Sequence, residues 1–217
     1  MQNPVFELLR LDELLVAGAR LQELGRPALE RARRFASAND REEFIGGRFA
    51  LLHFAASLLD VDPARLVPEY SCPQCGPGQD HGRPGFMLDG APAPLVLSAS
   101  RASGWVLLAG VVHPPEGARL GVDLEATDHA AFEGFDDVAL TAGEKHFLMT
   151  VLENQQAVQR ARLWARKEAW LKMTGEGLRR NPAELDVLDR PGLCDITSMH
   201  ESGQELPDGL VAAVAIS

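Results

Sequence analysis

The sequence predicts two similar α/β lobes packed together, and three observations support this fold class. Each half of the 217-residue chain has one long segment whose apolar residues recur at helical spacing, together with shorter apolar runs typical of buried strands. These elements do not alternate strictly as βαβ units. The hydrophobic content of 46% is enough to fill a core at this length. We place the boundary near residue 115, giving an N-terminal lobe of residues 1–115 and a C-terminal lobe of residues 116–217.

The first half is organised around one predicted helix, residues 40–60, with Asp40 as its expected N-terminal cap. Its apolar positions are Phe44, Leu51, Leu52, Ala55 and Leu59. Two apolar runs further along, residues 94–100 and 104–112, predict strands joined by a short link. The stretch at residues 113–118, which contains two prolines and a glycine, then interrupts this pattern.

The second half begins with a predicted strand at residues 119–126 and continues through two acidic, loosely helical stretches. A long helix near residues 157–175 follows, and Gly175 is its expected end. The apolar run at residues 209–216 predicts a buried strand. The segment from about residue 180 to residue 208 carries no clear pattern.

The charge balance and the cysteine content restrict the expected partners and compartment. Acidic residues outnumber basic ones by 31 to 21, and the net charge of −10 argues against nucleic acid and against a membrane surface as partners. The N-terminus has Glu7, Asp12 and Glu13 among its apolar residues, so we expect neither a secretory signal nor a transmembrane segment. Three cysteines are too few for a disulfide framework. We therefore expect a cytoplasmic protein.

A segment rich in proline and glycine, residues 72–85, contains Cys72, Cys75 and His81. Residues of these types at this spacing are typical of zinc ligands, but a structural zinc site needs four, and only Cys194 is available as a distant candidate for the fourth. Short motifs of this kind often match by chance. The favoured interpretation is a turn between two elements, and the alternative is a zinc-dependent interaction module.

Two acidic residues interrupt the apolar strand at residues 119–126. Asp123 and Glu125 are two positions apart, so both carboxylates should project from one face of the strand. Like charges this close repel each other unless water or a cation neutralises them. The pair is therefore a candidate site for a divalent metal.

The long helix carries a second pair of charges. Wound at about 3.6 residues per turn, this segment places Glu168 and Lys172 on an apolar face. The apolar members of that face are Val158, Ala161, Trp164, Ala165 and Leu171. The ordinary interpretation is an exposed ion pair, which contributes only about 0.3–0.5 kcal/mol. On a buried face the two charges need partners, and Asp123 with Glu125 would supply them together with a metal.

These motifs together resemble a known family. The stretch GVDLE at residues 121–125, followed about forty residues later by WARKEAWLKMTGEGL at residues 164–178, is similar to the paired signatures of the 4'-phosphopantetheinyl transferases of the larger, two-lobed type. Three upstream stretches fall in the family's order: RARRF at 31–35, HGRPGF at 81–86 and SASRASGW at 98–105. The resemblance therefore covers most of the chain.

The resemblance implies a pseudo-duplicated, two-lobed α/β fold with coenzyme A bound between the lobes. It implies transfer of the phosphopantetheine arm of coenzyme A to a serine of an acyl or peptidyl carrier protein, with release of adenosine 3',5'-bisphosphate. The N-terminal lobe would contact coenzyme A, and the C-terminal lobe would supply the metal site and the catalytic helix. Asp123, Glu125 and Glu168 would hold Mg²⁺, and Lys172 would approach the transferred phosphate. Lys167 belongs to the same signature with a less definite role.

The charges of these residues suit that reaction. A diphosphate is strongly anionic, so a hydroxyl that attacks its phosphorus needs a cation on the phosphate oxygens and a base for its proton. Carboxylates are suitable ligands for Mg²⁺. Glu168, or Glu125 acting through a coordinated water, is the expected base. Lys172 adds positive charge where negative charge accumulates.

Five residues of the first half are candidates for binding coenzyme A. Arg83 and Ser100 stand where the family has a basic residue and a serine. Arg101 stands where the family commonly has a histidine, which leaves open a guanidinium contact with a phosphate instead. Arg31 and Arg48 are weaker candidates, because surface arginines commonly serve solubility alone.

Three hypotheses about function stay open at this point. The first is the transferase, acting as a monomer on coenzyme A and a carrier protein. The second is a non-catalytic relative that binds coenzyme A or a carrier protein, and the arginine in place of the usual histidine motivates it. The third is the zinc-dependent module built on the two cysteines and the histidine.

Overall fold

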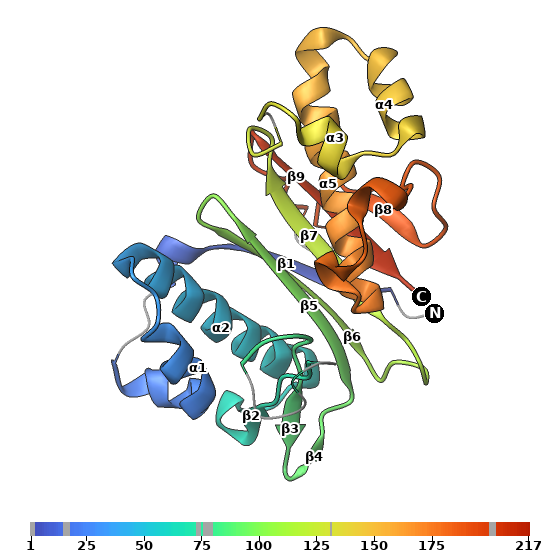
Figure 1. Cartoon of the computed structure of the whole chain (residues 1–217). Coiled ribbons are helices and arrows are strands. Elements are labelled where there is room, and N and C mark those ends of the chain that lie inside the picture. Colours follow the sequence, from blue (N-terminus) through green and yellow to red (C-terminus); the bar gives the residue numbers. More distant parts are fainter. Residues whose placement is uncertain (1–2, 15–17, 73–74, 76–79, 131, 200–202) are drawn as a thin grey trace. The chain divides into compact units, whose positions relative to one another are not determined.

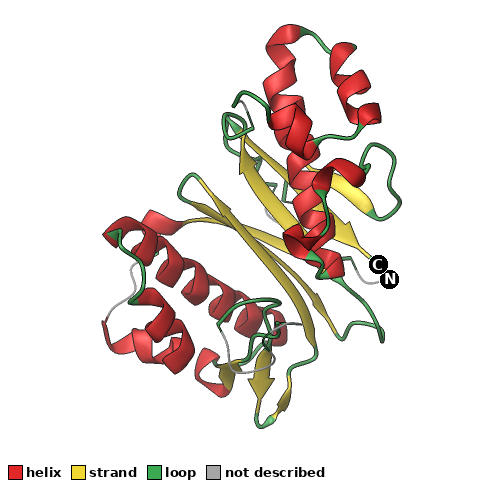
Figure 2. Ribbon diagram, in the orientation of Figure 1, coloured by secondary structure: helices red, strands yellow, loops and turns green. Residues whose placement is uncertain are grey.

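The structure, a computed structural model, describes residues 3–14, 18–72, 75, 80–130, 132–199 and 203–217. The chain forms two compact units: unit 1 comprises residues 1–99 and 104–117, and unit 2 comprises residues 100–103 and 118–217. Helices and small sheets make up both units (Figure 1, Figure 2), which confirms the predicted mixed α/β fold class. The pseudo-duplication stays a prediction, as do the roles expected for the two lobes.

Unit 1 has a three-stranded sheet with β6 at its centre. The strands, in order, are β1 (Val5–Arg10), β6 (Trp105–Val112) and β5 (Leu95–Ala102). β1 runs antiparallel to β6 along its whole length. The helix α2 (Ala38–Leu59) packs against β6, whose residues 106–111 are all buried. The core of unit 1 therefore lies between this helix and the sheet.

Shorter elements complete unit 1. These are η1 (Leu11–Glu13), η2 (Gly18–Leu24), α1 (Gly25–Ala32), η3 (Pro63–Arg65), β2 (Leu66–Pro68), β3 (Phe86–Leu88) and β4 (Ala91–Pro92). β2, β3 and β4 form a second small antiparallel sheet in that order. Because β2 and β3 flank the segment 69–85, their pairing holds the two ends of that segment together.

The N-terminal cap of α2 differs from the sequence prediction. Ser37 is the cap, and its hydroxyl accepts a hydrogen bond from the Asp40 amide at 3.3 Å. Asp40 lies instead in the first turn, where a negative charge is favourable near the positive end of the helix dipole. Serine and aspartate are equally good caps, which is why the pattern pointed to the wrong one. Three of the predicted apolar positions of α2, Leu51, Leu52 and Ala55, lie in the core of unit 1. Leu59 is partly buried and packs against that core, and Phe44 is buried as well.

Unit 2 has a three-stranded antiparallel sheet with β9 at its centre. The strands, in order, are β7 (Leu120–Ala126), β9 (Leu210–Ile216) and β8 (Leu193–Ile196). The 22-residue helix α5 (Glu153–Thr174) packs across all three strands (Figure 1). It ends at Gly175, whose φ of 76° gives the left-handed cap that the sequence predicted.

The two acidic stretches of the second half form the short helices α3 (Phe135–Ala139) and α4 (Ala142–Met149). The 3₁₀ turns η4 (Gly177–Arg179) and η5 (Pro182–Glu184) follow α5. α4 begins with a capping box, in which Thr141 and Glu144 bond to each other's backbone amides. α4 and η4 contact α5, and α3 meets it through the Phe135 and Trp164 rings.

α5 is buried on more sides than the predicted single face. Ala161, Ala165 and Leu171 are buried as expected, whereas Val158 and Trp164 are only partly buried. Leu163, Lys167, Ala169 and Met173 are buried as well. A helix covered by both a sheet and neighbouring helices hides residues all round, so a one-face pattern underestimates its burial. Among the helices in the described ranges, none combines the length and apolar character required to cross a membrane.

Candidate active site

β7 carries the two acidic residues predicted to bind a metal. Asp123 and Glu125 project from one face of the strand because they are two positions apart. Asp123 is only 3% exposed, whereas Glu125 is partly exposed. Pairing with β9 places Asp123 opposite Ala213 and Glu125 opposite Val211. This pairing fixes the backbone positions from which both carboxylates project.

α5 lies very close to β7 at Gly121. A Cβ atom on this residue would lie 2.5 Å from the amide nitrogen of Met173 and closer still to the carbonyl oxygen of Ala169. No side chain fits there, so only glycine allows the helix backbone to approach the strand this closely. The close approach brings Glu168 and Lys172, which lie in the same turns of α5, to the acidic residues of β7.

Lys172 and Asp123 form the central contact of this region. The Lys172 ammonium donates hydrogen bonds to Asp123 Oδ1 at 2.6 Å, to Ser100 Oγ at 2.9 Å and to the Val122 carbonyl oxygen at 3.2 Å. Ser100 donates in turn to Asp123 Oδ1 at 2.7 Å. The Lys172 side chain is 32% exposed, so a ligand can still reach its charge. Ser100, predicted as a coenzyme A contact, thus lies with the predicted metal ligands.

One oxygen of Asp123 is left unsatisfied by the protein. Asp123 Oδ2 is buried and has no hydrogen-bond partner among the described residues. Leaving a buried polar atom unpaired costs about 1–3 kcal/mol, and more for a charged group. Such atoms in native proteins commonly have a water or an ion as their partner. A cation bound beside Asp123 would satisfy this oxygen.

Burial and mutual repulsion disfavour the ionised forms of the other two carboxylates. The pKa of Glu125 is raised to about 7, first by burial and then by the charge of Asp123. The pKa of Glu168 is also raised, again by burial first and by Asp123 second. The positive charge of Lys172 opposes both shifts. Three carboxylates therefore share one ammonium group, which leaves excess negative charge when all three are ionised.

This donor set fits a hard divalent cation such as Mg²⁺, which prefers carboxylate oxygens. In the part of the chain that the structure describes, however, Asp123, Glu125 and Glu168 do not all place an oxygen within 4.8 Å of one another. Repulsion keeps carboxylates apart, and Lys172 already occupies Asp123 Oδ1. The ligands are thus present without an assembled coordination shell, and the metal assignment stays a prediction.

Glu125 also lines an apolar pocket of about 200 Å³ in unit 2. Phe132, Phe135 and Trp164 supply its aromatic walls. The Phe135 ring packs edge-on against the other two rings, with centroid distances of 5.4 Å and 5.9 Å. The pocket therefore offers a largely aromatic and aliphatic surface beside a carboxylate of the acidic cluster.

Lys167, the neighbour of Glu168 in the same signature, is fully buried. Its ammonium lies 2.7 Å from Glu144 Oε2 and donates to the carbonyl oxygens of Pro182 and Leu185. Burial lowers the pKa of Lys167, and the Glu144 carboxylate opposes that shift. Lys167 therefore connects α5 to α4 and to the segment around η5, whereas the neighbouring Glu168 lies near Asp123 in the acidic cluster.

Glu144 has all of its oxygens satisfied. Oε2 accepts from the Thr141 amide at 2.8 Å, and Oε1 accepts from the Val187 amide at 3.0 Å. The sequence did not predict this pair, because Glu144 lies in a short helix with no pattern that indicates burial. The capping box formed by Thr141 and Glu144 was the signal that could have placed this glutamate near backbone amides.

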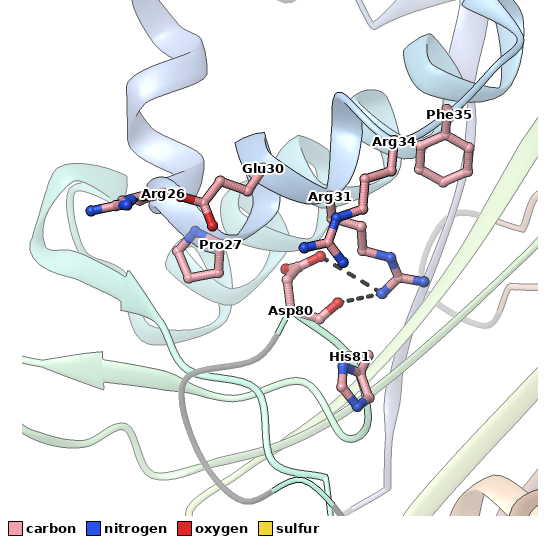
Figure 3. Close-up of a pocket in the computed structure, with 8 residues that line it drawn as sticks. All are labelled: Arg26, Pro27, Glu30, Arg31, Arg34, Phe35, Asp80 and His81. Atoms are coloured by element: carbon pink, nitrogen blue, oxygen red, sulfur yellow. Dashed lines mark hydrogen bonds and ion pairs between the residues drawn. The ribbon is translucent and has the colours of Figure 1, made fainter.

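Arg31 and Arg48 meet at a buried carboxylate in unit 1. Asp80 is 6% exposed, and Arg48 contacts both of its carboxylate oxygens at 3.0–3.1 Å. Arg31 points toward Asp80 (Figure 3), donates to its carbonyl oxygen and lies 3.8 Å from its Oδ2. The Arg48 guanidinium also lies 4.1 Å from the centre of the Tyr70 ring. Tyr70 is itself buried, and this burial raises the pKa of its hydroxyl to about 12. Arg48 is thus committed to Asp80 and Tyr70.

A basic pocket of about 840 Å³ opens beside Arg31 (Figure 3). Arg26, Arg31 and Arg34 line it together with two acidic residues, Glu30 and Asp80, of which Glu30 pairs with Arg26 at 2.7 Å. The pKa of Arg31 is lowered, first by burial and then by the charge of Arg48. Several guanidinium groups around one hollow produce a positive potential. The pocket therefore suits an anionic ligand.

The other two predicted coenzyme A contacts lie on different elements. Arg101 is exposed and follows Ser100 in β5. Because neighbouring residues of a strand point to opposite faces, Arg101 points away from the side on which Ser100 meets Asp123. Arg83 pairs through its backbone with Ser71, beyond the β2–β3 ladder.

Residues 119–212 match the family model of the 4'-phosphopantetheinyl transferase superfamily. The matched segment runs from the start of β7 into β9 and contains Asp123, Glu125, Glu168 and Lys172. The match covers somewhat less than half of the chain, and over these residues it confirms the resemblance recognised in the sequence. A search of the curated proteins found no match.

The buried pair of Lys167 and Glu144 yields a stability prediction. Lys167→Met leaves Glu144 as an unpaired buried charge and should lower the free energy of unfolding by about 3–5 kcal/mol. The double variant Lys167→Met/Glu144→Gln removes both charges and should recover part of that loss. Lys145→Met, which breaks the exposed pair with Asp137 at 2.8 Å, is the control and should cost about 1 kcal/mol or less. Urea unfolding measures all three, and equal losses for Lys145→Met and Lys167→Met would contradict the structural role of the buried pair.

Proposed function

We propose that this protein transfers the 4'-phosphopantetheine arm of coenzyme A to a serine of an apo acyl or peptidyl carrier protein in a Mg²⁺-dependent reaction. The serine oxygen attacks the phosphorus that bears the pantetheine arm, and a new P–O bond forms. The bond from that phosphorus to the bridging oxygen of the diphosphate breaks, and the electron pair leaves with adenosine 3',5'-bisphosphate. The serine proton passes to a base on the protein. The proposal rests on the superfamily match and on the acidic cluster of unit 2.

The observation that carries the proposal is the buried Asp123 with its unpartnered Oδ2. Glu125 and Glu168 lie close enough for the charge of Asp123 to raise the pKa of each. Asp123, Glu125 and Glu168 are therefore the proposed ligands of Mg²⁺. Bound there, Mg²⁺ supplies positive charge to the diphosphate oxygens as negative charge builds up on them.

Lys172 is the second source of positive charge at the reacting phosphate. Its ammonium is held in place by Ser100, Asp123 and the Val122 carbonyl oxygen, while a third of the side chain stays exposed. A charge fixed in advance needs no reorganisation during the reaction, so it stabilises the transition state effectively. Ser100 consequently acts as a positioning residue for Lys172.

Glu168 is the proposed base for the serine proton, with Glu125 acting through a coordinated water as the alternative. Glu168 lies on α5 one turn before Lys172, and it has no ion-pair partner within 4 Å in the described ranges. A carboxylate that is not held by a cationic side chain is free to accept a proton from a hydroxyl. The arrangement therefore provides a base and a cation on the same face of one helix.

The remaining groups of coenzyme A are the nucleotide phosphates and the uncharged pantetheine arm, and two separate pockets are the proposed contacts for them. Arg31 and its neighbours line the basic pocket of unit 1, which suits the phosphates of the nucleotide. The aromatic pocket beside Glu125 in unit 2 suits the uncharged pantetheine arm. Arg83 and Arg101 stay proposed contacts for phosphate. Arg48 is better described as the residue that positions Asp80 next to Arg31.

A transfer assay tests the proposal. The wild-type protein is incubated with coenzyme A, Mg²⁺ and a panel of apo carrier proteins, and mass spectrometry of the carrier detects the added phosphopantetheine. Asp123→Asn should reduce transfer by at least about 100-fold, the scale of losing one charge-stabilising group in an active site. Asp128→Asn removes an exposed carboxylate five residues further on and should transfer normally. Normal transfer by Asp123→Asn would contradict the metal assignment.

A second experiment separates catalysis from binding. A non-catalytic relative that binds coenzyme A is the alternative function, motivated by Arg101 in place of the family's histidine. Glu168→Gln keeps the shape of the side chain and removes its charge and basicity, so turnover should fall by about 100-fold or more while coenzyme A affinity changes far less. Glu153→Gln, an exposed position at the start of the same helix, is the control. If the wild type binds coenzyme A in calorimetry but modifies no carrier protein, the alternative is correct.

A further inference from the structure

The segment between β2 and β3 brings two metal-binding residue types together through the backbone. Ser71 and Arg83 exchange both of their backbone hydrogen bonds, at 3.0 Å and 2.9 Å, and the Glu69 amide donates to the Gly85 carbonyl oxygen at 2.8 Å. These bonds extend the β2–β3 ladder by two steps. Cys72 directly follows one of the paired residues, and His81 lies two positions before the other. The ladder therefore holds Cys72 and His81 at the same end of the small sheet.

Gly82 makes this approach close. A Cβ atom at this position would lie 2.9 Å from the Cα of Cys72 and closer still to the carbonyl oxygen of Ser71. Its φ of 92° is also one that other residues rarely adopt. Only glycine at position 82 allows the backbone next to His81 to contact the backbone of Ser71 and Cys72.

Three ligand atoms converge as a result. One atom from each of Cys72, Cys75 and His81 lies within 4.8 Å of the other two. Among the described residues, this is the one group of three or more histidine, cysteine or acidic side chains that meets that distance. Cys75 is exposed and Cys72 and His81 are partly exposed, so a metal ion can reach the group from solvent.

We propose that Cys72, Cys75 and His81 bind a Zn²⁺ ion that fastens the segment between β2 and β3. Two thiolates separated by two residues and one imidazole nitrogen are ligands typical of zinc, and they do not suit Mg²⁺. The three protein ligands leave one tetrahedral position for water, so the proposed site is an open one and lacks the fourth protein ligand of a closed structural zinc site. Asp80 is not the fourth ligand, because Arg48 bonds both of its carboxylate oxygens. Cys194 lies on β8 of unit 2 and is not part of this group.

The proposed ion has a structural consequence for unit 1. Asp80 precedes the ligand His81 and holds Arg31 and Arg48. A metal bond to His81 would fix the backbone directly after Asp80. The pairing of Ser71 with Arg83 already holds the two ends of the segment together. The zinc site would thus support the residues that shape the basic pocket, which His81 also lines. This inference is independent of the transferase proposal, because its ligands lie outside the acidic cluster.

Metal analysis of the reduced protein tests the site. Protein purified without chelators should contain one Zn²⁺ per chain by elemental analysis. Replacement by Co²⁺ should produce the absorption bands of a tetrahedral ion bound to thiolates, which carboxylate ligands do not give. Cys75→Ser should lose both the zinc and the thiolate bands. Cys194→Ser, which removes the third cysteine of the chain, should keep them.

A second variant keeps the test decisive if Cys75→Ser folds poorly. His81→Ala retains both thiolates, so it should bind Co²⁺ more weakly with altered bands, while its circular dichroism shows whether the fold is intact. Asp123→Asn should retain one zinc, which distinguishes this ion from a metal in the acidic cluster. Wild-type protein that is reduced, free of zinc and without thiolate bands in Co²⁺ would overturn the proposal. Zinc retained by a folded Cys75→Ser variant would overturn it as well.

Discussion

The contact between Lys172 and the buried carboxylate of Asp123 is the interaction on which the candidate site depends. Burying a charge this deeply is unfavourable unless the charge is paired and hydrogen-bonded. Lys172 and Ser100 satisfy Oδ1, and Oδ2 has no partner among the described residues. The pair therefore stabilises one oxygen and leaves the other available, which is the arrangement expected of a cation ligand. Replacing Gly121 by any residue with a Cβ atom would push the strand away from the helix and break this contact.

Charged residues of α5 make contacts on two sides of the helix, one set in the acidic cluster and the other in a buried ion pair. Glu168 and Lys172 lie toward β7, where their charges interact with Asp123. Lys167 is instead buried against Glu144 of α4 and the carbonyl oxygens near η5. Adjacent residues of a helix point about 100° apart, so one short signature can carry both a lysine in a buried ion pair and the glutamate proposed as the base. The buried pair fixes the rotation of α5, and that rotation in turn aims Glu168 and Lys172.

Much of this arrangement could be predicted from the sequence because its signals are local. The alternation that places Asp123 and Glu125 on one face, the spacing of Glu168 and Lys172, and the glycine end of α5 all follow from helix and strand periodicity. β1 was missed, because Glu7 and Arg10 interrupt its apolar pattern at an edge of the sheet. β8 was missed for a similar reason, since its four residues include Asp195.

Features that depend on contacts distant in the sequence could not be predicted. Asp80 draws Arg31 and Arg48 together across 49 and 32 residues, and no local pattern indicates which acid an arginine will meet. The same limit applies to Glu144 with Lys167. The sequence favours a turn at the cysteine motif, because it offers only the distant Cys194 as a fourth ligand. The backbone pairing of Ser71 with Arg83 is what gives His81 its place beside the two cysteines.

A crystal structure with coenzyme A and Mn²⁺, which substitutes for Mg²⁺ and scatters anomalously, tests the central claim most directly. The account predicts one anomalous peak at coordination distance from Asp123 Oδ2 and from carboxylate oxygens of Glu125 and Glu168, with the Lys172 ammonium near the coenzyme A diphosphate. The account is contradicted if coenzyme A is bound while no anomalous peak lies near Asp123 and its Oδ2 still lacks a partner.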